Sequence, residues 1–431
     1  MKNIIGTFAF TVLLISCGSK NSSIDKINEK NVEENLNFFH TEISEKPIYS
    51  NSPYTKNIKK CARTRDYYKA CKVSETPFIG LDDGKDTEIV KILNKTLISR
   101  DWQGENFKNF LLENKDNKEL LHLFKHTTGV IISHRLHNSF FMPLTGMIYI
   151  EAKYFYNQEV DLGKDKNAKF LYEVADPRTE NYSEEKDDRE LVNYLAFDDF
   201  RSKDTELSTY SKDPQQMNLS LIRVLYHELT HAADLFSYNL RNSESYQLEM
   251  TFTELYQSNI ENKNLISQKM SDSVQNISSD MLNAVEQCTL EGETSHDEYK
   301  DCQFDINEIM DEFRNSDKVS LYGFYTIHEH IATLHTHLLM LKNHNVMSTA
   351  VFLETDEYLN KEKRNKTIIN SISLKITNPK PFNSASLVYS EIYNTQVDKS
   401  FIRNIVSFEL EDISYKDMVE TLNEKMMGIA Q

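Results

Sequence analysis

The sequence predicts an α+β fold in which a small mixed sheet accompanies a larger set of helices. Residues 129–136 and 147–152 have the short apolar runs typical of strands, and a turn signal at residues 143–146 precedes the second run. Helical patterns extend over residues 86–97 and 106–124, and helices dominate the later part of the chain. With 431 residues, 39% of them hydrophobic, the chain is long enough for a folded core of two lobes.

The first 16 residues have the features of a secretory signal peptide. Lys2 precedes the apolar residues 4–15, a stretch shorter than the roughly 20 residues that a membrane span requires. The order Leu-Ile-Ser-Cys at residues 14–17 also resembles the bacterial lipobox, in which the chain is cut before a cysteine that carries lipid. This resemblance implies a lipid anchor on Cys17 in the cell envelope. Because Gly18 and not Asp follows it, we expect the outer membrane, on its periplasmic face or at the cell surface.

Composition divides the rest of the chain into further regions. Residues 17–55 are rich in Asn, Lys, Ser and Glu, which predicts a flexible tether between the anchor and the folded part. Residues 158–213 are polar and acidic and predict a long surface excursion. The predicted regions after the tether are an N-terminal part with the sheet and helices of an upper lobe (56–213), a helical region with an insertion (214–344) and a mixed C-terminal region (345–431) with a last helix at 415–427.

The charge balance excludes one large class of partners. The net charge is −17 and the isoelectric point is near 5.3, without a cluster of Lys and Arg that could bind phosphate. We therefore expect no nucleic-acid partner. The sequence also lacks coiled-coil heptads, so we expect a monomer.

Four cysteines besides Cys17 form two locally spaced pairs. Export would expose them to an oxidising compartment, so the spacing predicts the disulfides Cys61–Cys71 and Cys288–Cys302. The two other connectivities remain open. A metal site of four cysteines is the alternative, but neither pair has the CxxC spacing typical of such sites.

The segment that carries the chemistry is an HExxH motif on a predicted helix. Asp213 can cap this helix and Pro214 suits its first position. His227 and His231 are four residues apart, so their imidazoles project one turn apart and can reach one tetrahedral Zn²⁺. Glu228 lies between them and can act as the base for a water on the metal. A buried apolar stripe is expected at Ile222, Leu225, Leu229, Ala232 and Phe236.

A second motif resembles the third-ligand helix of gluzincin metallopeptidases, which are zincins. In that family a Glu-x-x-Ala sequence supplies the third zinc ligand, and a Tyr seven residues before the Glu stabilises the oxyanion. The resemblance implies that Glu329 is the ligand, Ala332 the small residue beneath it, and Tyr322 the oxyanion donor. It also implies a zincin-like fold, with a small sheet and the HExxH helix above the metal and a mainly helical lobe below.

Other carboxylates near the HExxH motif remain open as ligands. Glu329 is 98 residues after His231, a distance longer than in compact gluzincins that we interpret as an insertion holding the second disulfide. Without an insertion, Glu249 or Glu254 would be the ligand, on a helical pattern over residues 244–258. Asp234 suits a hydrogen bond to a ligand imidazole better than metal binding, and an ordinary solvated side chain is equally compatible with its position.

Histidines are also frequent near Glu329. They could form a second metal site, using His330 with His335 or His337, but a helix with partly exposed histidines is the simpler interpretation. The five histidines in this segment are His328, His330, His335, His337 and His344.

Together these observations predict a zinc-dependent endopeptidase that binds one Zn²⁺ per chain and cuts protein or peptide substrates. By analogy with the family, the peptide would pair with the strand near residues 147–152. A non-catalytic zinc-binding lipoprotein on the same scaffold, acting in binding or adhesion, is the alternative. A third hypothesis is hydrolysis of non-peptide amides such as those of cell-wall crosslinks.

Overall fold

The computed structural model divides into two compact units, which we describe separately. The first contains the described residues up to 155 and residues 214–271, and the second contains residues 191–197 and the described residues from 311 onward. The structure describes residues 44–63, 70–82, 84–136, 138–155, 191–197, 214–236, 248–271, 311, 313, 315–320, 323, 326–344, 349–355, 367–374, 376–400 and 413–414. The region predicted over residues 214–344 is therefore divided between the two units.

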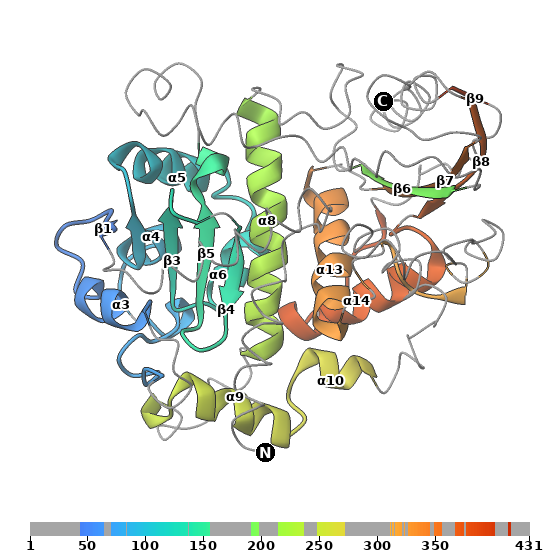
Figure 1. Ribbon diagram of the computed structural model, residues 1–431. Helices are drawn as coiled ribbons and strands as arrows, with labels where there is room; N and C mark the ends of the chain where they lie inside the picture. The colour runs from blue at the N-terminus through green and yellow to red at the C-terminus, as the bar shows by residue number, and fades with distance from the viewer. Residues whose placement is uncertain are drawn as a thin grey trace, which may run out of the picture. The chain divides into compact units, whose positions relative to one another are not determined.

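The first unit is built around a mixed five-stranded sheet with the order β1-β2-β3-β5-β4 (Figure 1). The three central strands are parallel, and β1 and β4 at the two edges are antiparallel to their neighbours. Every residue of β2, β3, β4 and β5 is buried, as expected for strands that are covered on both faces. The strands are β1 (Lys46–Pro47), β2 (Thr96–Ile98), β3 (Gly129–Ser133), β4 (Phe140–Met142) and β5 (Met147–Glu151).

The predicted turn at residues 143–146 joins β4 to β5 in a hairpin. The amide of Gly146 donates to the carbonyl of Met142 at 2.9 Å, and Gly146 has a φ of 65°. A Cβ at this position would lie 2.8 Å from the Thr128 side chain, so both backbone and space require glycine. The hairpin corrects the expectation that a peptide could pair with the strand near residues 147–152. This strand, β5, has a neighbour on both sides, and the edge strand here is β4, which we did not predict from the sequence.

The helices of the first unit differ from the prediction in two places. The pattern over residues 86–97 ends as a helix at Asn94, and the β-branched Thr96 begins a strand. The pattern over residues 106–124 is two helices, because Asn117 caps the second by accepting from the Leu120 amide at 3.0 Å. The helices up to residue 155 are α3 (Thr55–Cys61), η2 (Ile79–Leu81), α4 (Glu88–Asn94), α5 (Asp101–Glu113), α6 (Lys118–Phe124) and η3 (Ala152–Phe155).

The end of the predicted tether belongs to this unit. Strand β1 pairs with β2, and the preceding Glu45 is completely buried. Its carboxylate accepts from the Arg135 guanidinium at 2.8 Å and from the Ser133 hydroxyl at 2.5 Å. A buried carboxylate with these partners fixes the chain, so the tether prediction for residues 17–55 extends too far at its C-terminal end.

In the described part of the second unit, two helices accompany an antiparallel sheet of order β6-β7-β8-β9. Helix α14 packs against α13 (Figure 1). Strand β6 lies within the segment predicted as a polar surface excursion, which corrects that prediction; its Val, Leu and Tyr residues favour a strand. The predicted helix over residues 415–427 lies outside the described residues. The elements are β6 (Leu191–Phe197), α13 (Ile327–His344), β7 (Thr349–Thr355), β8 (Thr367–Leu374), α14 (Pro379–Tyr393) and β9 (Ile413–Ser414).

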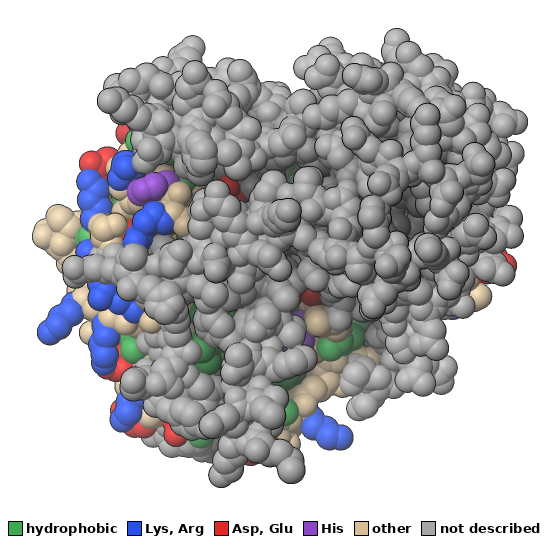
Figure 2. All heavy atoms as spheres, viewed as in Figure 1, with side chains coloured by type: hydrophobic (Ala, Val, Ile, Leu, Met, Phe, Trp, Pro, Cys, Tyr) green, Lys and Arg blue, Asp and Glu red, His purple; other side chains and the backbone are tan. Residues whose placement is uncertain are grey.

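Many charged side chains of the described residues lie on the surface, although a few, such as Glu45, are buried. In Figure 2, Lys and Arg side chains are spread along one edge of the face shown, with Asp and Glu between them. Pairs such as Lys46–Asp101 and Lys72–Glu249 are largely exposed, so solvent screens them and they contribute little to stability. None of the helices in the described ranges is long and apolar enough to cross a membrane.

Candidate metal centre

The HExxH motif lies in the C-terminal half of a long amphipathic helix of the first unit, α8 (Pro214–Leu235), drawn in light green in Figure 1. The helix begins at Pro214 as predicted, and Asp213 lies outside the described residues. It packs against α6 and against β4 and β5 of the sheet. Its apolar stripe is buried as predicted, with at most 3% of each side chain exposed at Ile222, Leu225, Leu229, Ala232 and Phe236.

The two histidines of the motif face one another. Their Nε2 atoms are 3.2 Å apart, and their rings are nearly perpendicular, with an angle of 85° between the ring planes. Two nitrogens that each lie about 2.0–2.1 Å from a tetrahedral Zn²⁺ are about 3.4 Å apart. The spacing of His227 and His231 therefore fits two ligands of one zinc ion. His231 is 9% exposed and His227 is half-buried, so the pair lies at the edge of the core.

Glu228 is completely buried between these histidines. Burying a carboxylate costs free energy, and an apolar residue would fill this position in a purely structural helix. A buried carboxylate next to two converging imidazoles is therefore a candidate for acid–base chemistry.

Polar side chains fix the middle of α8. The hydroxyl of Thr230 donates to the carbonyl of Tyr226 at 2.6 Å, and the Tyr226 hydroxyl accepts from the Asn117 amide at 2.7 Å. Both Thr230 and Tyr226 are buried. Asn117 is also the cap of α6, so the same side chain joins α6 to the helix that carries the motif.

The C-terminal end of α8 is held by two further helices, α9 (Phe252–Glu261) and α10 (Ile266–Ser271). The buried Asn259 of α9 donates to the carbonyl of Leu235 at 2.7 Å. Asp234 accepts from the amide of Ser267 in α10 at 2.7 Å. Asp234 is only 1% exposed, so the interpretation of a solvated side chain is wrong.

Glu329 lies in the first turn of α13 in the second unit and is 5% exposed. The hydroxyl of Thr326 accepts from the Glu329 amide at 3.1 Å and caps the helix. The ligand atoms of His227, His231 and Glu329 all lie within 4.8 Å of one another, a group that could hold a metal ion. Two nitrogens and one carboxylate oxygen are a common donor set for zinc.

The two alternative ligands have other partners. Glu249 is exposed and forms an ion pair with Lys72 at 2.9 Å, which raises the pKa of Lys72. Glu254 is exposed and accepts from the amide of Thr251 at 2.8 Å in a capping box that begins α9, and this hydrogen bond lowers its pKa. Neither carboxylate belongs to a candidate ligand group among the described residues. The helical pattern over residues 244–258 corresponds to α9, which begins later than predicted.

The gluzincin resemblance also implies roles for Ala332 and Tyr322. Ala332 is completely buried in α13, as expected for a position in close contact with neighbours. Tyr322 lies outside the described residues.

The histidines after Glu329 form no candidate metal group with one another in the described part of the chain. His330, His335 and His337 are buried, so the expectation of partly exposed histidines is wrong for these three. The ring of His335 lies near Tyr393, with 5.6 Å between ring centroids. Burial lowers the pKa of His335 to about 3, so this side chain is a neutral core residue at physiological pH.

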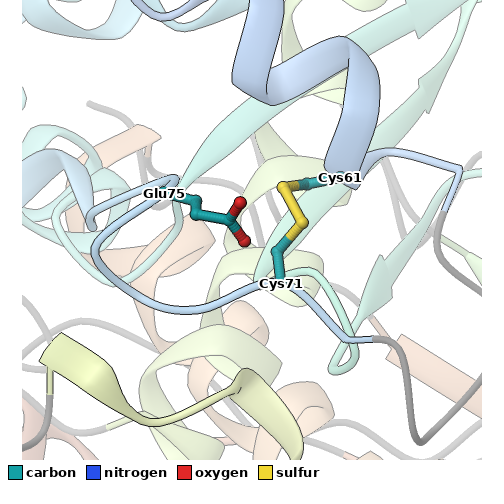
Figure 3. Close-up of side chains that lie close together, drawn as sticks. All are labelled: Cys61, Cys71 and Glu75. Atoms are coloured by element: carbon teal, nitrogen blue, oxygen red, sulfur yellow. A yellow bond between two sulfur atoms is a disulfide. The ribbon is translucent and has the colours of Figure 1, made fainter.

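The predicted disulfide Cys61–Cys71 is present and buried (Figure 3). The Glu75 carboxylate lies beside it and accepts from the amide of Lys72 at 3.0 Å. Because the two sulfurs are bonded to each other, these side chains stabilise the fold rather than offer thiolate ligands. The other predicted disulfide and the lipidation site lie outside the described residues, at Cys17, Cys288 and Cys302.

Sequence reasoning missed a buried polar cluster at the base of α13. The carboxylate of Asp317 contacts His330 at 3.0 Å and accepts from the hydroxyl of Ser384 at 2.5 Å. Burial would raise the pKa of Asp317, but hydrogen bonds from these two residues outweigh it and bring the pKa to about 2. Burial lowers the pKa of the adjacent Lys318 to about 7. His330 and Ser384 follow Asp317 by 13 and 67 positions, so no local pattern joins them to it. The one signal in the sequence is the polar pair Asp317-Lys318 before an apolar helix.

Comparison with known proteins found no matching family model, no similar curated protein and no similar solved structure. The chemistry of the site therefore rests on the residues and distances of this chain.

Proposed function

We propose that this chain is a zinc-dependent endopeptidase, held at the bacterial cell envelope by lipid on Cys17. One observation carries the proposal: the Nε2 atoms of His227 and His231 are 3.2 Å apart on one helix, with the buried Glu228 between them. In this proposal Glu329 is the third ligand of one Zn²⁺.

The ligand set supports a catalytic rather than a structural metal. Structural zinc sites are closed by four protein ligands, whereas catalytic sites have three and keep a position for water or substrate. The candidate group among the described residues has three members. A structural site also has no use for a base, yet Glu228 is retained at the cost of burying a carboxylate.

The chemistry would proceed through the side chains of α8. A Zn²⁺ held by this group would polarise the peptide carbonyl and lower the pKa of a bound water to about 7. Glu228 takes a proton from the attacking water and delivers it to the leaving peptide nitrogen. Because Glu228 is shielded from bulk solvent, its electrostatic interactions with the reacting atoms are stronger than in water. The phenol of Tyr322 is proposed, from the sequence resemblance alone, to donate to the oxyanion.

The strand that would pair with a peptide substrate is β4, not β5. Strand β5 has neighbours on both sides, whereas β4 has a single neighbour among the described strands. Helix α8 packs against β4, so a peptide added at this edge would run close to the HExxH helix. An extended backbone supplies these hydrogen bonds in any sequence, which fits hydrolysis of unfolded proteins.

The direct test is digestion of casein by the mature chain, measured with and without chelator, beside Glu228→Gln and the exposed control Glu249→Gln. We expect chelator to abolish digestion and Glu228→Gln to lower it at least about a hundredfold, the size of a lost acid–base group, with zinc still bound. Glu249→Gln should retain full activity.

Two outcomes would favour the other functions. A wild-type chain that binds zinc but digests no protein, while releasing fragments from peptidoglycan, would support hydrolysis of cell-wall amides. Zinc binding without either activity would support the non-catalytic binding lipoprotein. Equal digestion by wild type and Glu228→Gln would refute the catalytic mechanism itself.

A further inference from the structure

The Asp317 carboxylate joins two helices of the second unit. One oxygen, Oδ1, lies 3.0 Å from Nε2 of His330 in the first turn of α13, and the other, Oδ2, accepts from Oγ of Ser384 in α14 at 2.5 Å. His330 is completely buried, and Asp317 and Ser384 are 8% and 9% exposed. Both carboxylate oxygens are therefore engaged in the interior, one with each helix.

This carboxylate remains charged at neutral pH, since its pKa is about 2. Placing a charge in the interior is expensive, and well-packed apolar residues at the same positions often give a protein at least as stable. An arrangement of this kind is better explained by the orientation that it imposes than by stability alone.

The element that it orients is the turn that carries Glu329. His330 follows Glu329 directly, and both lie in the first turn of α13, where the helix end tends to fray. The amide of Glu329 is bonded to the side chain of Thr326, and only from His330, whose amide donates to the carbonyl of Thr326 at 3.0 Å, does the backbone ladder begin. The Thr326 cap holds the amide of Glu329, but it does not fix the rotation of the turn against its surroundings. The contact of His330 with Asp317 supplies that constraint.

The chain before α13 is packed closely against the same histidine. A Cβ added to Gly323 would lie 3.2 Å from Nδ1 of His330 and 3.3 Å from Cδ of Lys318. These distances are tight, so a larger side chain at position 323 would push His330. The imidazole is thus held from the loop side as well as by Asp317.

We infer that Asp317 is a positioning residue for the metal site: by tying His330 to Ser384, it fixes the first turn of α13 and so the direction of the Glu329 carboxylate. This inference rests on the proposed role of Glu329 as third ligand. Removing a direct hydrogen-bond partner of a metal ligand typically lowers metal affinity by about 10–100-fold. Because Asp317 acts through His330, the neighbour of the ligand, its loss should have an effect at the lower end of this range.

The test uses the mature chain and measures Zn²⁺ affinity by competition with a chelator, together with the visible absorption spectrum of the Co²⁺-loaded protein. We expect Asp317→Asn to weaken Zn²⁺ binding about 10-fold and to lower the intensity of the Co²⁺ bands, because a misdirected carboxylate is replaced by water. Ser384→Ala should weaken binding less. His330→Gln, whose amide can still donate to Asp317, should bind more tightly than His330→Leu.

Matched controls lie in the same unit. Ser386→Ala removes a hydroxyl of α14 that donates only to the carbonyl of Phe382, and Asp398→Asn alters an exposed carboxylate that accepts from Ser400. Both should leave the affinity and the Co²⁺ spectrum unchanged. If Asp398→Asn weakens binding as much as Asp317→Asn, the effect comes from the loss of one negative charge anywhere in the unit, and the inference is wrong.

The outcomes separate this inference from the proposed function. Wild-type affinity and spectrum in Asp317→Asn would overturn the positioning role alone. If Asp317→Asn does not fold, Ser384→Ala decides: weakened binding supports the role and unchanged binding overturns it. A wild-type chain that binds no zinc would refute the proposed function and this inference with it.

Discussion

The two helices that supply the proposed ligands are stabilised in different ways. His227 and His231 lie in the C-terminal half of α8, where the backbone ladder still fixes their separation and a sheet and helices of the first unit cover the apolar stripe. Glu329 lies in the first turn of α13, where no complete ladder exists and side chains from elsewhere must fix the turn. The comparison teaches that a ligand pair set by local helical spacing needs few further contacts to fix its geometry. A ligand at a helix end depends on tertiary contacts.

The largest expected effect concerns the pair in α8. His231→Ala should weaken Zn²⁺ binding by more than the about 10–100-fold loss that follows removal of a ligand's hydrogen-bond partner, because a direct donor is lost. Chelator competition measures this loss, and His344→Ala, a half-buried histidine at the end of α13, is the control. Equal affinities of the two variants would break the comparison, because His231 would then not be a ligand.

A large effect on stability is expected where α8 meets its core. Phe236 is 1% exposed and packs against the rings of Phe78, Phe141 and Phe252. Phe236→Ala should lower the free energy of unfolding of the first unit by about 3–5 kcal/mol, through lost burial and the cavity that remains.

The fluorescence of Trp102, the single tryptophan of the chain, reports this transition, because it lies in α5 of the same unit. A loss below about 1 kcal/mol in denaturant titration would mean that the aromatic cluster does not hold α8 as described.

A further effect concerns how the stability of the second unit depends on pH. The folded-state pKa of His335 is about 3 because of burial, against 6.5 for the exposed side chain. Between these values the unfolded chain binds a proton that the folded chain does not, so stability falls as the pH drops from 6.5 toward 3. In His335→Phe this part of the acid loss should disappear, as measured by hydrogen exchange in α13. Parallel acid losses in wild type and variant would contradict the assignment of His335 as a buried neutral residue.

The parts of the molecule that could be predicted from the sequence are those set by local spacing. The HExxH helix, the hairpin turn at Gly146, strands β3 and β5 and the Cys61–Cys71 bond all follow from patterns within about twenty residues. The edge strand β4 is three residues long and lacks a pattern of its own.

The errors arose where distant contacts decide the structure. Glu45 is buried only because Arg135 and Ser133 meet it from 88–90 positions away. Strand β6 depends on pairing with β7, whose residues lie 152–164 positions later. Composition alone could not reveal either arrangement, because a polar segment becomes ordered when its partners satisfy its charges and backbone groups.

The central claim is that His227, His231 and Glu329 together hold one Zn²⁺. The most direct measurement is the zinc content per chain, after dialysis against a weak chelator, of wild type, Glu329→Ala, Glu254→Ala and Glu249→Ala. The account predicts one zinc in wild type and in the variants of the two exposed carboxylates, and a large loss in Glu329→Ala alone. Full zinc content in Glu329→Ala, or loss in either of the other variants, would contradict it.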